Sequence, residues 1–505
     1  MKIQSVSLLM AAGLQQARAI QLDVSSPGMT ALFLSSSPAY WNSSDQSTAS
    51  LRNASTALAY NLMTYYKNNQ SSTATTAIGT LPAPLYWWEA GAVWGGMIDY
   101  WAYTNDTSYN PTITQALLAQ VGPDNNYMPP AYYASLGNDD QAFWALAVLA
   151  AVEYGYPEGP TGSPSWLSLA EAVFNTMVPR WDTTTCAGGL RWQVFASNAG
   201  YNYKNSISNG GFFQIASRLA HYTGNSTYYD WAEKIWDWTV SIGLIDKNYA
   251  IYDGTDDTIN CTQVDHTLWS YNEGMFIYGT AILYNYTNAS TIWQDRTTGL
   301  LQAANRTFFS PYKNASNIMF ETACELTNNC NNDQYSFKAY LARWLAKTSI
   351  VAPYTAPAIH TLLVASAEAA AKSCSGGTDG VTCGEKWYTG GYDGNYGVGQ
   401  QLSALEVTQA LLIANAPKLR TGPEVSIQGA PTTTLNLNSA TPTSTSGSGV
   451  APAAASASAS GQAGKNSANS GALGFRGHGY GRHGVRALVA AAAGLALGSF
   501  CFEAI

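Results

Sequence analysis

The stretch Leu136-Gly137-Asn138-Asp139-Asp140-Gln141-Ala142-Phe143-Trp144 places two adjacent carboxylates between a turn and a strongly apolar segment that continues to Ala151. Asn138 is a candidate N-cap, because its side chain can accept a hydrogen bond from a free backbone N–H of the first turn. Gln141 follows three residues later and can reach back to the cap, as in a capping box. The stretch therefore predicts an apolar helix that begins at Asn138 and carries both acids in its first turn.

The pair Asp139 and Asp140 has two interpretations. Acids are common at helix starts, where they complement the helix dipole and need no other role. Alternatively, they are a nucleophile and a general acid/base. Neighbouring helical residues diverge by about 100°, so the two carboxyl groups can lie about 5 Å apart, the spacing of a retaining glycosidase. Repulsion between the like charges raises one pKa, while the dipole favours the ionised form of the other acid. The pair alone does not decide between these interpretations.

The composition favours a carbohydrate-binding protein. Only 11% of the 505 residues are charged, less than half the usual share, while Trp (16) and Tyr (32) are abundant. Many of these aromatic residues belong to the core, but exposed rings can stack on sugars. The net charge of −8 argues against a nucleic-acid partner. There is no glycine-rich phosphate loop and no His/Cys spacing typical of metal ligands, so we expect no cofactor and no metal, and we expect a monomer.

Apolar residues recur at intervals of three and four along most of the chain, which indicates helices. We expect helices at about 46–68, 87–104, 111–120, 138–155, 164–178, 205–223, 226–243, 268–284, 288–306, 332–348, 353–373 and 398–415. Short β-prone segments lie at 189–195 and 251–252. Six helical hairpins in a ring predict an all-α fold, the (α/α)6 toroid, with a cleft at one end. An α-solenoid also fits the helix count, but no repeat of fixed sequence is present.

Several loops combine aromatic residues, glycine and amide or acid groups close to a predicted helix start. In a toroid these helix starts can converge on one rim and line a sugar groove. The side chains that we expect to bind substrate are Trp87, Trp88, Glu89, Trp144, Asn209, Asp256 and Asp257. Asp256 and Asp257 are also a second acid pair that competes with the first for the catalytic role. They lie in a Gly/Thr-rich loop instead of at a helix start, so we prefer Asp139 and Asp140.

The N-terminus has the features of a secretory signal peptide at residues 1–19. Lys2 precedes an apolar stretch, and Ala17-Arg18-Ala19 is a cleavage site, so the mature chain should begin near Ile20. The sequence also contains ten N-x-S/T sequons, which favour a secreted glycoprotein with these side chains facing solvent. They are Asn42, Asn53, Asn69, Asn105, Asn225, Asn260, Asn285, Asn288, Asn305 and Asn314.

Six of the seven cysteines lie in the helical part of the chain, an even number that suits an oxidising compartment. Short sequence separations favour two local disulfides, and the two remaining cysteines then form the third. Six cysteines allow 15 pairings, so the pairing rests on proximity alone. The expected bridges are Cys324–Cys330, Cys374–Cys383 and Cys186–Cys261.

After Gly422 the composition changes. Residues 423–470 contain no aromatic residue and are rich in Ser, Thr, Ala, Gly and Pro, which predicts an O-glycosylated stalk. Residues 471–505 continue through a polar spacer to a short apolar run at the C-terminus. A single membrane span is an alternative, but the run is short for one. We expect a GPI-anchor signal that is removed after attachment at Asn469 or Ser470, which places the protein at the plasma membrane or cell wall.

Five separated segments together resemble glycoside hydrolase family 76, and within it the fungal Dfg/Dcw cell-wall proteins, which are mannan endo-1,6-α-mannosidases. They are residues 87–91 (WWEAG), 137–140 (GNDD), 188–192 (GGLRW), 205–213 and 269–274. The resemblance covers roughly residues 20–420. It implies an (α/α)6 catalytic domain over about 20–422 and a retaining mechanism on α-1,6-linked mannose.

By position within this resemblance, Asp139 is the nucleophile and Asp140 the general acid/base. The resemblance further implies that the substrate is α-1,6-mannan or the core glycan of GPI proteins, and that the fungal branch can transfer the glycan to a β-glucan acceptor. The alternative function is a non-catalytic, GPI-anchored wall lectin or adhesin that binds mannan with the same groove. A lectin does not need the two acids, so their presence favours the enzyme.

Overall fold

Every second helix is apolar on nearly all sides, and this pattern decides which helices form the inside of the fold. The computed structural model describes residues 22, 45–70 and 72–422, all of which lie in the compact unit formed by residues 1–440. The largely buried helices are α2 (Trp87–Thr104), α4 (Asn138–Tyr154), α6 (Ser206–Thr223), α8 (Ser270–Tyr286), α10 (Phe337–Val351) and α12 (Val398–Gln409). The intervening helices are α1 (Asp45–Thr64), α3 (Asn110–Ala119), α5 (Trp166–Met177), α7 (Ser226–Ser241), α9 (Thr291–Phe308) and α11 (Ala356–Ser373).

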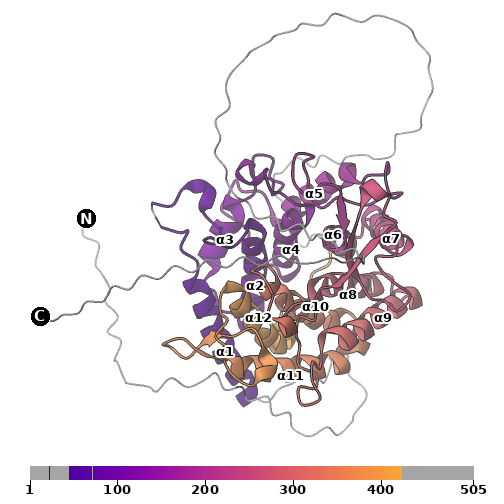
Figure 1. The fold of residues 1–505 in the computed structure, drawn as a ribbon. Coiled ribbons are helices and arrows are strands. Elements are labelled where there is room, and N and C mark those ends of the chain that lie inside the picture. The colour runs from indigo at the N-terminus through magenta and orange to yellow at the C-terminus, as the bar shows by residue number, and fades with distance from the viewer. Residues whose placement is uncertain (1–21, 23–44, 71, 423–505) are drawn as a thin grey trace, which may run out of the picture. The chain divides into compact units, whose positions relative to one another are not determined.

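The even-numbered helices form a closed inner ring (Figure 1). Each packs on the next from α2 to α12, and α12 returns to α2. The odd-numbered helices lie outside this ring, each against a neighbouring inner helix. The architecture is the predicted (α/α)6 toroid, and all twelve predicted ranges coincide with a helix to within a few residues. The burial pattern thus separates inner from outer helices as expected for helices that are apolar all round.

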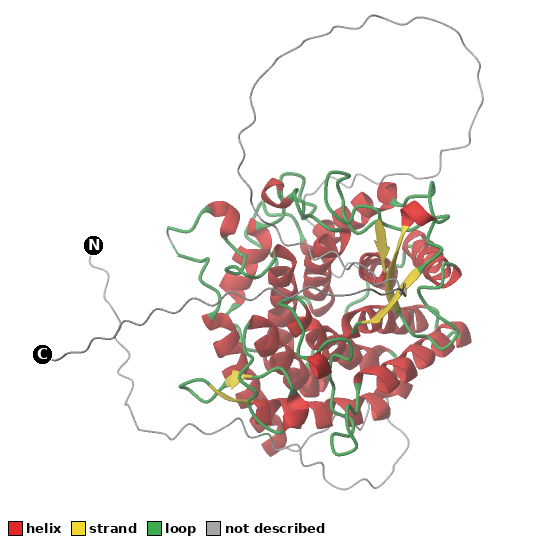
Figure 2. Cartoon of the chain, in the orientation of Figure 1, coloured by secondary structure: helices red, strands yellow, loops and turns green. Residues whose placement is uncertain are grey.

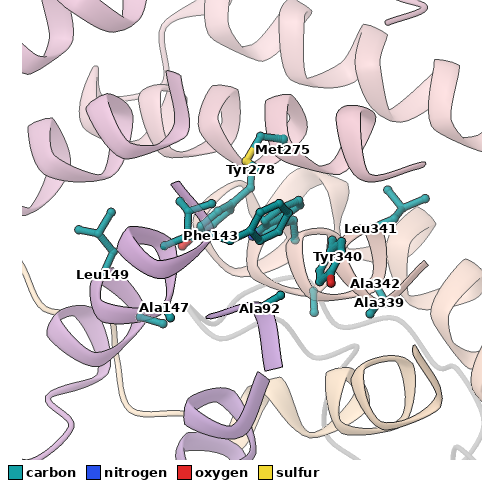
Figure 3. Close-up of a cluster of buried hydrophobic side chains, with 14 of the residues drawn as sticks. Ala92, Phe143, Ala147, Leu149, Met275, Tyr278, Ala339, Tyr340, Leu341 and Ala342 are labelled. Atoms are coloured by element: carbon teal, nitrogen blue, oxygen red, sulfur yellow. The ribbon is translucent and has the colours of Figure 1, made fainter. Parts of the chain in front are cut away.

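The centre of the ring is filled by side chains from the inner helices (Figure 3). Phe143 of α4 packs on Tyr340 of α10 with ring centroids 5.0 Å apart, and Met275 of α8 is completely buried. Small residues such as Ala92 and Ala147 allow the helices to approach closely. Because these side chains interdigitate at the centre of the circle of helices, the inner helices and their first turns are held in fixed positions.

Two small antiparallel sheets interrupt the helices (Figure 2). The first contains β1 (Tyr203–Asn205), β2 (Tyr252–Asp256) and β3 (Val264–Leu268), and the second pairs β4 (Cys374–Gly376) with β5 (Thr382–Cys383). The β-prone segment at 251–252 leads into β2. The prediction for 189–195 is wrong, because the segment is a loop with one bridge, from Gln193 to Gly137. Gly189 has a φ of 94°, which is outside the range of strand residues.

The predicted disulfides are present as Cys186–Cys261, Cys324–Cys330 and Cys374–Cys383. Nine of the ten sequon asparagines lie in the described part of the chain, and all nine are exposed, as predicted. The tenth, Asn42, lies outside the described residues, as do residues 1–19 and 423–505 with the candidate attachment sites Asn469 and Ser470. Among the described residues, no single helix is long and apolar enough to cross a membrane. The bent pair Gln334–Val351 and Pro353–Ser373 would qualify only together, by length and composition.

Candidate active site

The helix α4 begins with an acid that caps its own first turn. Gly137 is the N-cap residue in an extended conformation, and its backbone N–H donates to Asp140 Oδ2 at 2.8 Å. Asp140 therefore occupies the third helical position and reaches back to the cap, which is half of a capping box. This bond fixes one carboxyl oxygen of Asp140 and leaves the other for chemistry.

The predicted capping roles of Asn138 and Gln141 are wrong. Asn138 Nδ2 donates to the carbonyl of Arg191 at 2.8 Å, and Gln141 Nε2 donates to the carbonyl of Asn126 at 2.6 Å. Asn138 is instead the first helical residue, its own N–H binds the carbonyl of Trp192, and both side-chain amides bind neighbouring loops. The consequence is that α4 is tied on two sides to the loops that surround its first turn.

Asp139 lies beside a loop tryptophan. The side chain of Asp139 is half-buried, but its Oδ1 atom is inaccessible and has no hydrogen-bond partner of normal geometry among the described residues. The indole N–H of Trp192 faces this carboxyl group, and it favours the ionised form together with the backbone N–H groups of Asp139 and Asp140. Three donors therefore converge on Asp139, at the positive end of the α4 dipole.

Burial raises the pKa of both acids. The pKa of Asp140 rises to about 7, because burial and the charge of Asp333 outweigh the hydrogen bond from Gly137. The pKa of Asp139 is also well above its usual range, through burial and the charge of Asp140. Two adjacent acids of this kind share one proton over a broad range around neutral pH. The donors around Asp139 oppose the rise in its pKa, while the negative charge of Asp140 adds to it.

Two further acids approach Asp140 from other inner helices. Glu89, in the first turn of α2, accepts the N–H of Tyr86 at 2.6 Å, and its other oxygen is buried without a hydrogen bond among the described residues. Asp333, just before α10, accepts the indole N–H of Trp88 at 3.1 Å. Burial raises the pKa of both, that of Asp333 to about 6, and the Asp333 charge contributes to the shift at Glu89. These two and Asp140 all lie at helix starts, so the first turns of α2, α4 and α10 meet at one rim.

The predicted aromatic contacts divide into two kinds. Trp88 lies at the rim, with its indole on Asp333 and its ring 4.7 Å from that of Phe143. Trp87 stacks on Trp144 with ring centroids 5.1 Å apart. The prediction that Trp144 contacts substrate is wrong, because its side chain is 0% exposed and is part of the core. Trp144 lies one helical turn after Asp140. This position in the sequence does not show that its side chain points away from the rim.

Three other predicted contacts are bound by groups of the protein itself. Asn209 is completely buried and binds the backbone of Leu190 in both directions, at 2.8 and 3.0 Å, so the prediction that it contacts substrate is wrong. Asp257 is also buried and forms a salt bridge with Arg191, which removes it as a catalytic competitor. Asp256 is exposed and binds Thr258 at the start of a short 3₁₀ helix. The pair therefore holds loops in place.

Some residues at this site were not predicted. Tyr271, in the first turn of α8, is close enough to Asp253, Asp139 and Asp333 that their charges add to burial in raising its pKa. Asp253 on β2 accepts the hydroxyl of Tyr203 at 2.7 Å, and burial raises its pKa to about 6. Trp192 and Tyr271 lie in the segments 188–192 and 269–274 that resemble family 76, and Asp253 comes three residues before Asp256. Asp333 lies in an Asn-rich loop with no pattern that marks it.

The sequence profile of Glycosyl hydrolase family 76 matches residues 50–422. The chain belongs to glycosyl hydrolase family 76. Among its relatives in the family is the mannan endo-1,6-alpha-mannosidase DCW1 of Candida glabrata. The two are 48% identical over 390 residues, which cover 76% of this chain and 85% of that protein. The enzyme of the same name from Saccharomyces cerevisiae is 49% identical over 360 residues, covering 71% of this chain and 78% of that protein.

Solved structures of family 76 proteins have the same fold. Dfg5 from Chaetomium thermophilum, determined in complex with glucosamine, superposes with a TM-score of 0.72 at 41% identity, covering 76% of this chain and 95% of that one. An inactive variant of the alpha-1,6-mannanase GH76A of Salegentibacter, in complex with alpha-1,6-mannotriose, gives a TM-score of 0.57 at 17% identity. It covers 72% of this chain and 99% of that one, and it extends the likeness of fold beyond fungi.

Proposed function

We propose that this family 76 chain is a retaining glycosidase or transglycosidase for α-1,6-mannoside linkages, in mannan or in the GPI core glycan, during fungal cell-wall biogenesis. The observation that carries the proposal is the pair Asp139 and Asp140, adjacent in the first turn of α4 and both with raised pKa. The fungal relatives named mannan endo-1,6-alpha-mannosidase support the substrate class.

In the first half-reaction, the Asp139 carboxylate attacks the anomeric carbon, and the bond from that carbon to the glycosidic oxygen breaks. Asp140 gives its proton to the leaving oxygen, so the leaving sugar departs as a neutral alcohol. A mannosyl ester of Asp139 and an ionised Asp140 remain. A pKa of about 7 suits this role, because Asp140 can then hold its proton at mildly acidic pH.

In the second half-reaction, Asp140 takes a proton from the incoming hydroxyl group, whose oxygen attacks the anomeric carbon and releases Asp139. Water as the incoming group gives hydrolysis, and a sugar hydroxyl gives transfer. A β-glucan is the acceptor that we propose for transfer. Trp88, whose indole N–H binds Asp333, is the ring that we propose to hold a sugar in place of water, whereas the predicted contact Trp87 is buried between Tyr132 and Trp144.

The experiment is incubation of the secreted protein with an α-1,6-mannooligosaccharide, with and without a β-glucan oligosaccharide, followed by mass analysis. Shorter mannosides alone identify a hydrolase, and mannosyl-glucan products identify a transglycosidase. Binding without any new product contradicts the enzyme and identifies a mannan lectin. The matched control is the Asp139→Asn variant, which has the same groove without the nucleophile.

The proposal also includes processing of the chain. The signal peptide at 1–19 is removed, the catalytic domain of 20–422 is carried on the stalk of 423–470, and residues 471–505 are exchanged for a GPI anchor at Asn469 or Ser470. A GPI-specific phospholipase should release the mature protein, and truncation before Ala487 should send it into the medium. Membrane retention after that truncation would contradict the anchor.

A further inference from the structure

We propose that Trp192 is a positioning residue for Asp139, with its indole N–H as the donor that holds the Asp139 carboxyl in the orientation for attack. This inference rests on the proposed function, because it concerns the nucleophile of that reaction. It assigns a role to a loop residue that lies 53 positions after the acid in sequence and is brought to it only by the fold.

The first observation is the space at Gly137. A Cβ atom on this residue would lie 2.2 Å from Asp139 Oδ1 and 3.2 Å from Trp192 Nε1. The carboxyl oxygen and the indole nitrogen therefore border the same small space, and a methyl group would fill it. The φ of Gly137 is −92°, which any residue can adopt. Glycine is thus required here for the approach of the two side chains and not for the backbone conformation.

The second observation is that Trp192 cannot move away independently of α4. Its backbone carbonyl accepts the N–H of Asn138 at 2.8 Å, and its own N–H donates to the carbonyl of Tyr203 at 2.6 Å. Its ring lies against Gly200, where a Cβ atom would come within 2.4 Å of a ring carbon. The tryptophan is therefore held at its backbone from both sides and at its ring.

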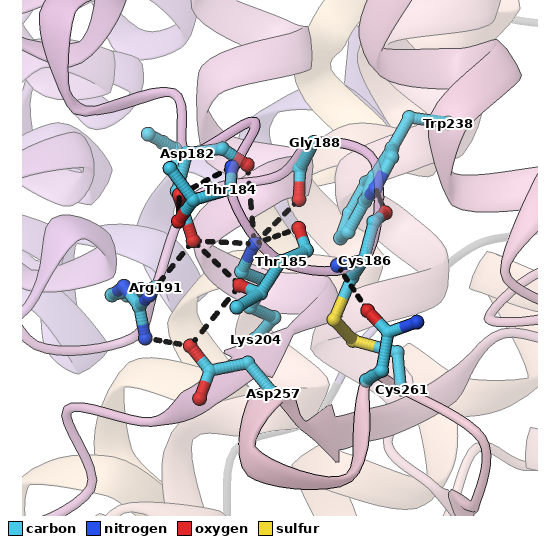
Figure 4. A network of polar contacts seen from close by, with 12 residues as sticks. Asp182, Thr184, Thr185, Cys186, Gly188, Arg191, Lys204, Trp238, Asp257 and Cys261 are labelled. Atoms are coloured by element: carbon cyan, nitrogen blue, oxygen red, sulfur yellow. Dashed lines mark hydrogen bonds and ion pairs between the residues drawn. A yellow bond between two sulfur atoms is a disulfide. The ribbon is translucent and has the colours of Figure 1, made fainter.

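The third observation is the rigidity of the loop that leads to Trp192 (Figure 4). Lys204 is completely buried, and its ammonium group donates to the carbonyls of Thr185 and Gly188 at 2.9 and 2.6 Å. The disulfide Cys186–Cys261 ties the same loop to the β2–β3 hairpin. The same ammonium group forms a salt bridge with Asp182 at 3.0 Å, so one buried cation binds both the side chain and the backbone of this loop and fixes its conformation.

These contacts leave the two Asp139 oxygens in different surroundings. Oδ1 is inaccessible and lies on the side of Gly137 and Trp192. Since Oδ1 is inaccessible, the half-buried carboxyl group can present only its other oxygen to a substrate. The donor also favours the ionised carboxylate, which is the form that a nucleophile needs.

The test is Trp192→Phe, which removes the N–H but keeps most of the ring. We expect kcat on an α-1,6-mannoside to fall about tenfold to a hundredfold, the effect of one hydrogen bond to a charged group, with KM nearly unchanged. The acid limb of the pH profile of kcat/KM should move to higher pH, because Asp139 loses a donor that favours its charge. The matched control is Trp181→Phe, since the Trp181 N–H is buried with no partner among the described residues.

Gly137→Ala is a second, independent variant. The added methyl group meets the end of the Asp139 side chain, which can rotate aside, so we expect an intact fold with a similar loss of kcat. A wild-type pH profile and kcat in folded Trp192→Phe, when Asp139→Asn is inactive, overturn the inference and leave the proposed function standing. If folded Asp139→Asn keeps its activity, the proposed function fails first. If Trp181→Phe loses as much activity as Trp192→Phe, the effect is general loop damage and the assignment of Trp192 is overturned.

Discussion

Two groups of buried charged residues lie along the same inner helices, and they are built differently. At the rim, four acids come together at helix starts: Glu89, Asp139, Asp140 and Asp333. Among the described residues, none of the four forms a salt bridge. Farther along the helices, three acids and three bases form a paired network. Its members are Asp99, Glu153, Arg218, Arg343, Lys347 and Glu406.

In the paired network, each charged side chain forms a salt bridge with another member of the network. Arg218 binds both oxygens of Glu153, at 2.7 and 2.8 Å, and Lys347 binds Asp99 at 2.8 Å. The three bases lie beyond the first turns of α6 and α10, whereas Glu89, Asp139 and Asp140 lie in first turns, where the helix dipole favours anions.

The difference shows how one barrel can give buried acids two roles. An acid with a bound cation keeps a constant charge and contributes to structure. An acid that is buried among other acids takes up a proton near neutral pH, and a group that gains and loses a proton there can do acid/base chemistry. We therefore expect substitutions at the rim to affect turnover, and substitutions in the network to affect folding.

The largest expected effect is at the rim. Asp139→Asn and Asp140→Asn should each lower turnover of an α-1,6-mannoside by at least about a thousandfold, because the reaction loses its nucleophile or its proton donor. The free energy of unfolding should not decrease, since each change removes one of two repelling carboxyl groups. Turnover assays and thermal melts on the same samples check both statements. Near-wild-type turnover in either folded variant contradicts the catalytic assignment.

Substitutions in the paired network should lower stability and leave turnover unchanged. Arg218→Met leaves the Glu153 carboxylate buried without its cation, so we expect a loss of about 3–5 kcal/mol in the free energy of unfolding. Turnover per folded molecule should stay close to wild type. Denaturant unfolding provides the measurement, and the double variant Arg218→Met/Glu153→Met should recover much of the loss. A strong decrease in turnover without loss of stability would contradict the proposed difference between the acids at the rim and the paired network.

The acids at the rim should also make the free energy of unfolding depend on pH. The pKa values of Asp140 and Asp333, about 7 and about 6, lie above the value of about 4 for an acid in the unfolded chain. The folded state therefore binds protons more tightly at these two acids, and their contribution to stability is fully present below about pH 4 and decreases as the pH rises toward 7. Thermal melts across this range should show the decrease, and it should be smaller in Asp140→Asn. A stability that increases over this range in the wild type contradicts this account.

The smallest effect is expected at Asp333, which acts on Asp140 only through its charge. In Asp333→Asn the amide oxygen can still accept the Trp88 indole, but the negative charge is lost. Since that charge raises the pKa of Asp140, the variant should lose its proton donor at lower pH. The alkaline limb of the pH profile of kcat/KM should therefore move to lower pH, with turnover at acidic pH unchanged. An alkaline limb that stays in place would show that Asp333 does not act on Asp140.

Much of the fold and the centre of the site could be predicted from local patterns. The helix starts that converge on the rim are visible as apolar runs after turns, and Asp139 and Asp140 are adjacent in sequence. Residues from distant segments could not be assigned in this way. Asp333 and Trp192 approach the pair only because the ring closes.

Errors in the predicted site have a common physical reason. Sequence position does not say which direction a side chain faces once a helix is surrounded on all sides. Trp144 and Asn209 lie on inner helices close to the rim, yet both point into the core. The capping prediction failed because the cap position falls on Gly137, whose N–H binds Asp140, while the Asn138 N–H binds the carbonyl of Trp192.

The most direct test of the acid pair as nucleophile and proton donor is the anomeric configuration of the first product. Adjacent acids in one helical turn do not easily reach the separation of about 6.5–9.5 Å that an inverting enzyme keeps between its carboxyl groups, so the assignment of these two acids predicts a covalent intermediate on Asp139 and retention. Proton NMR of an α-1,6-mannoside during the first turnovers should show the α-anomer of the newly released reducing end, before mutarotation. Initial appearance of the β-anomer would contradict the account, because a more distant acid would then have to activate water.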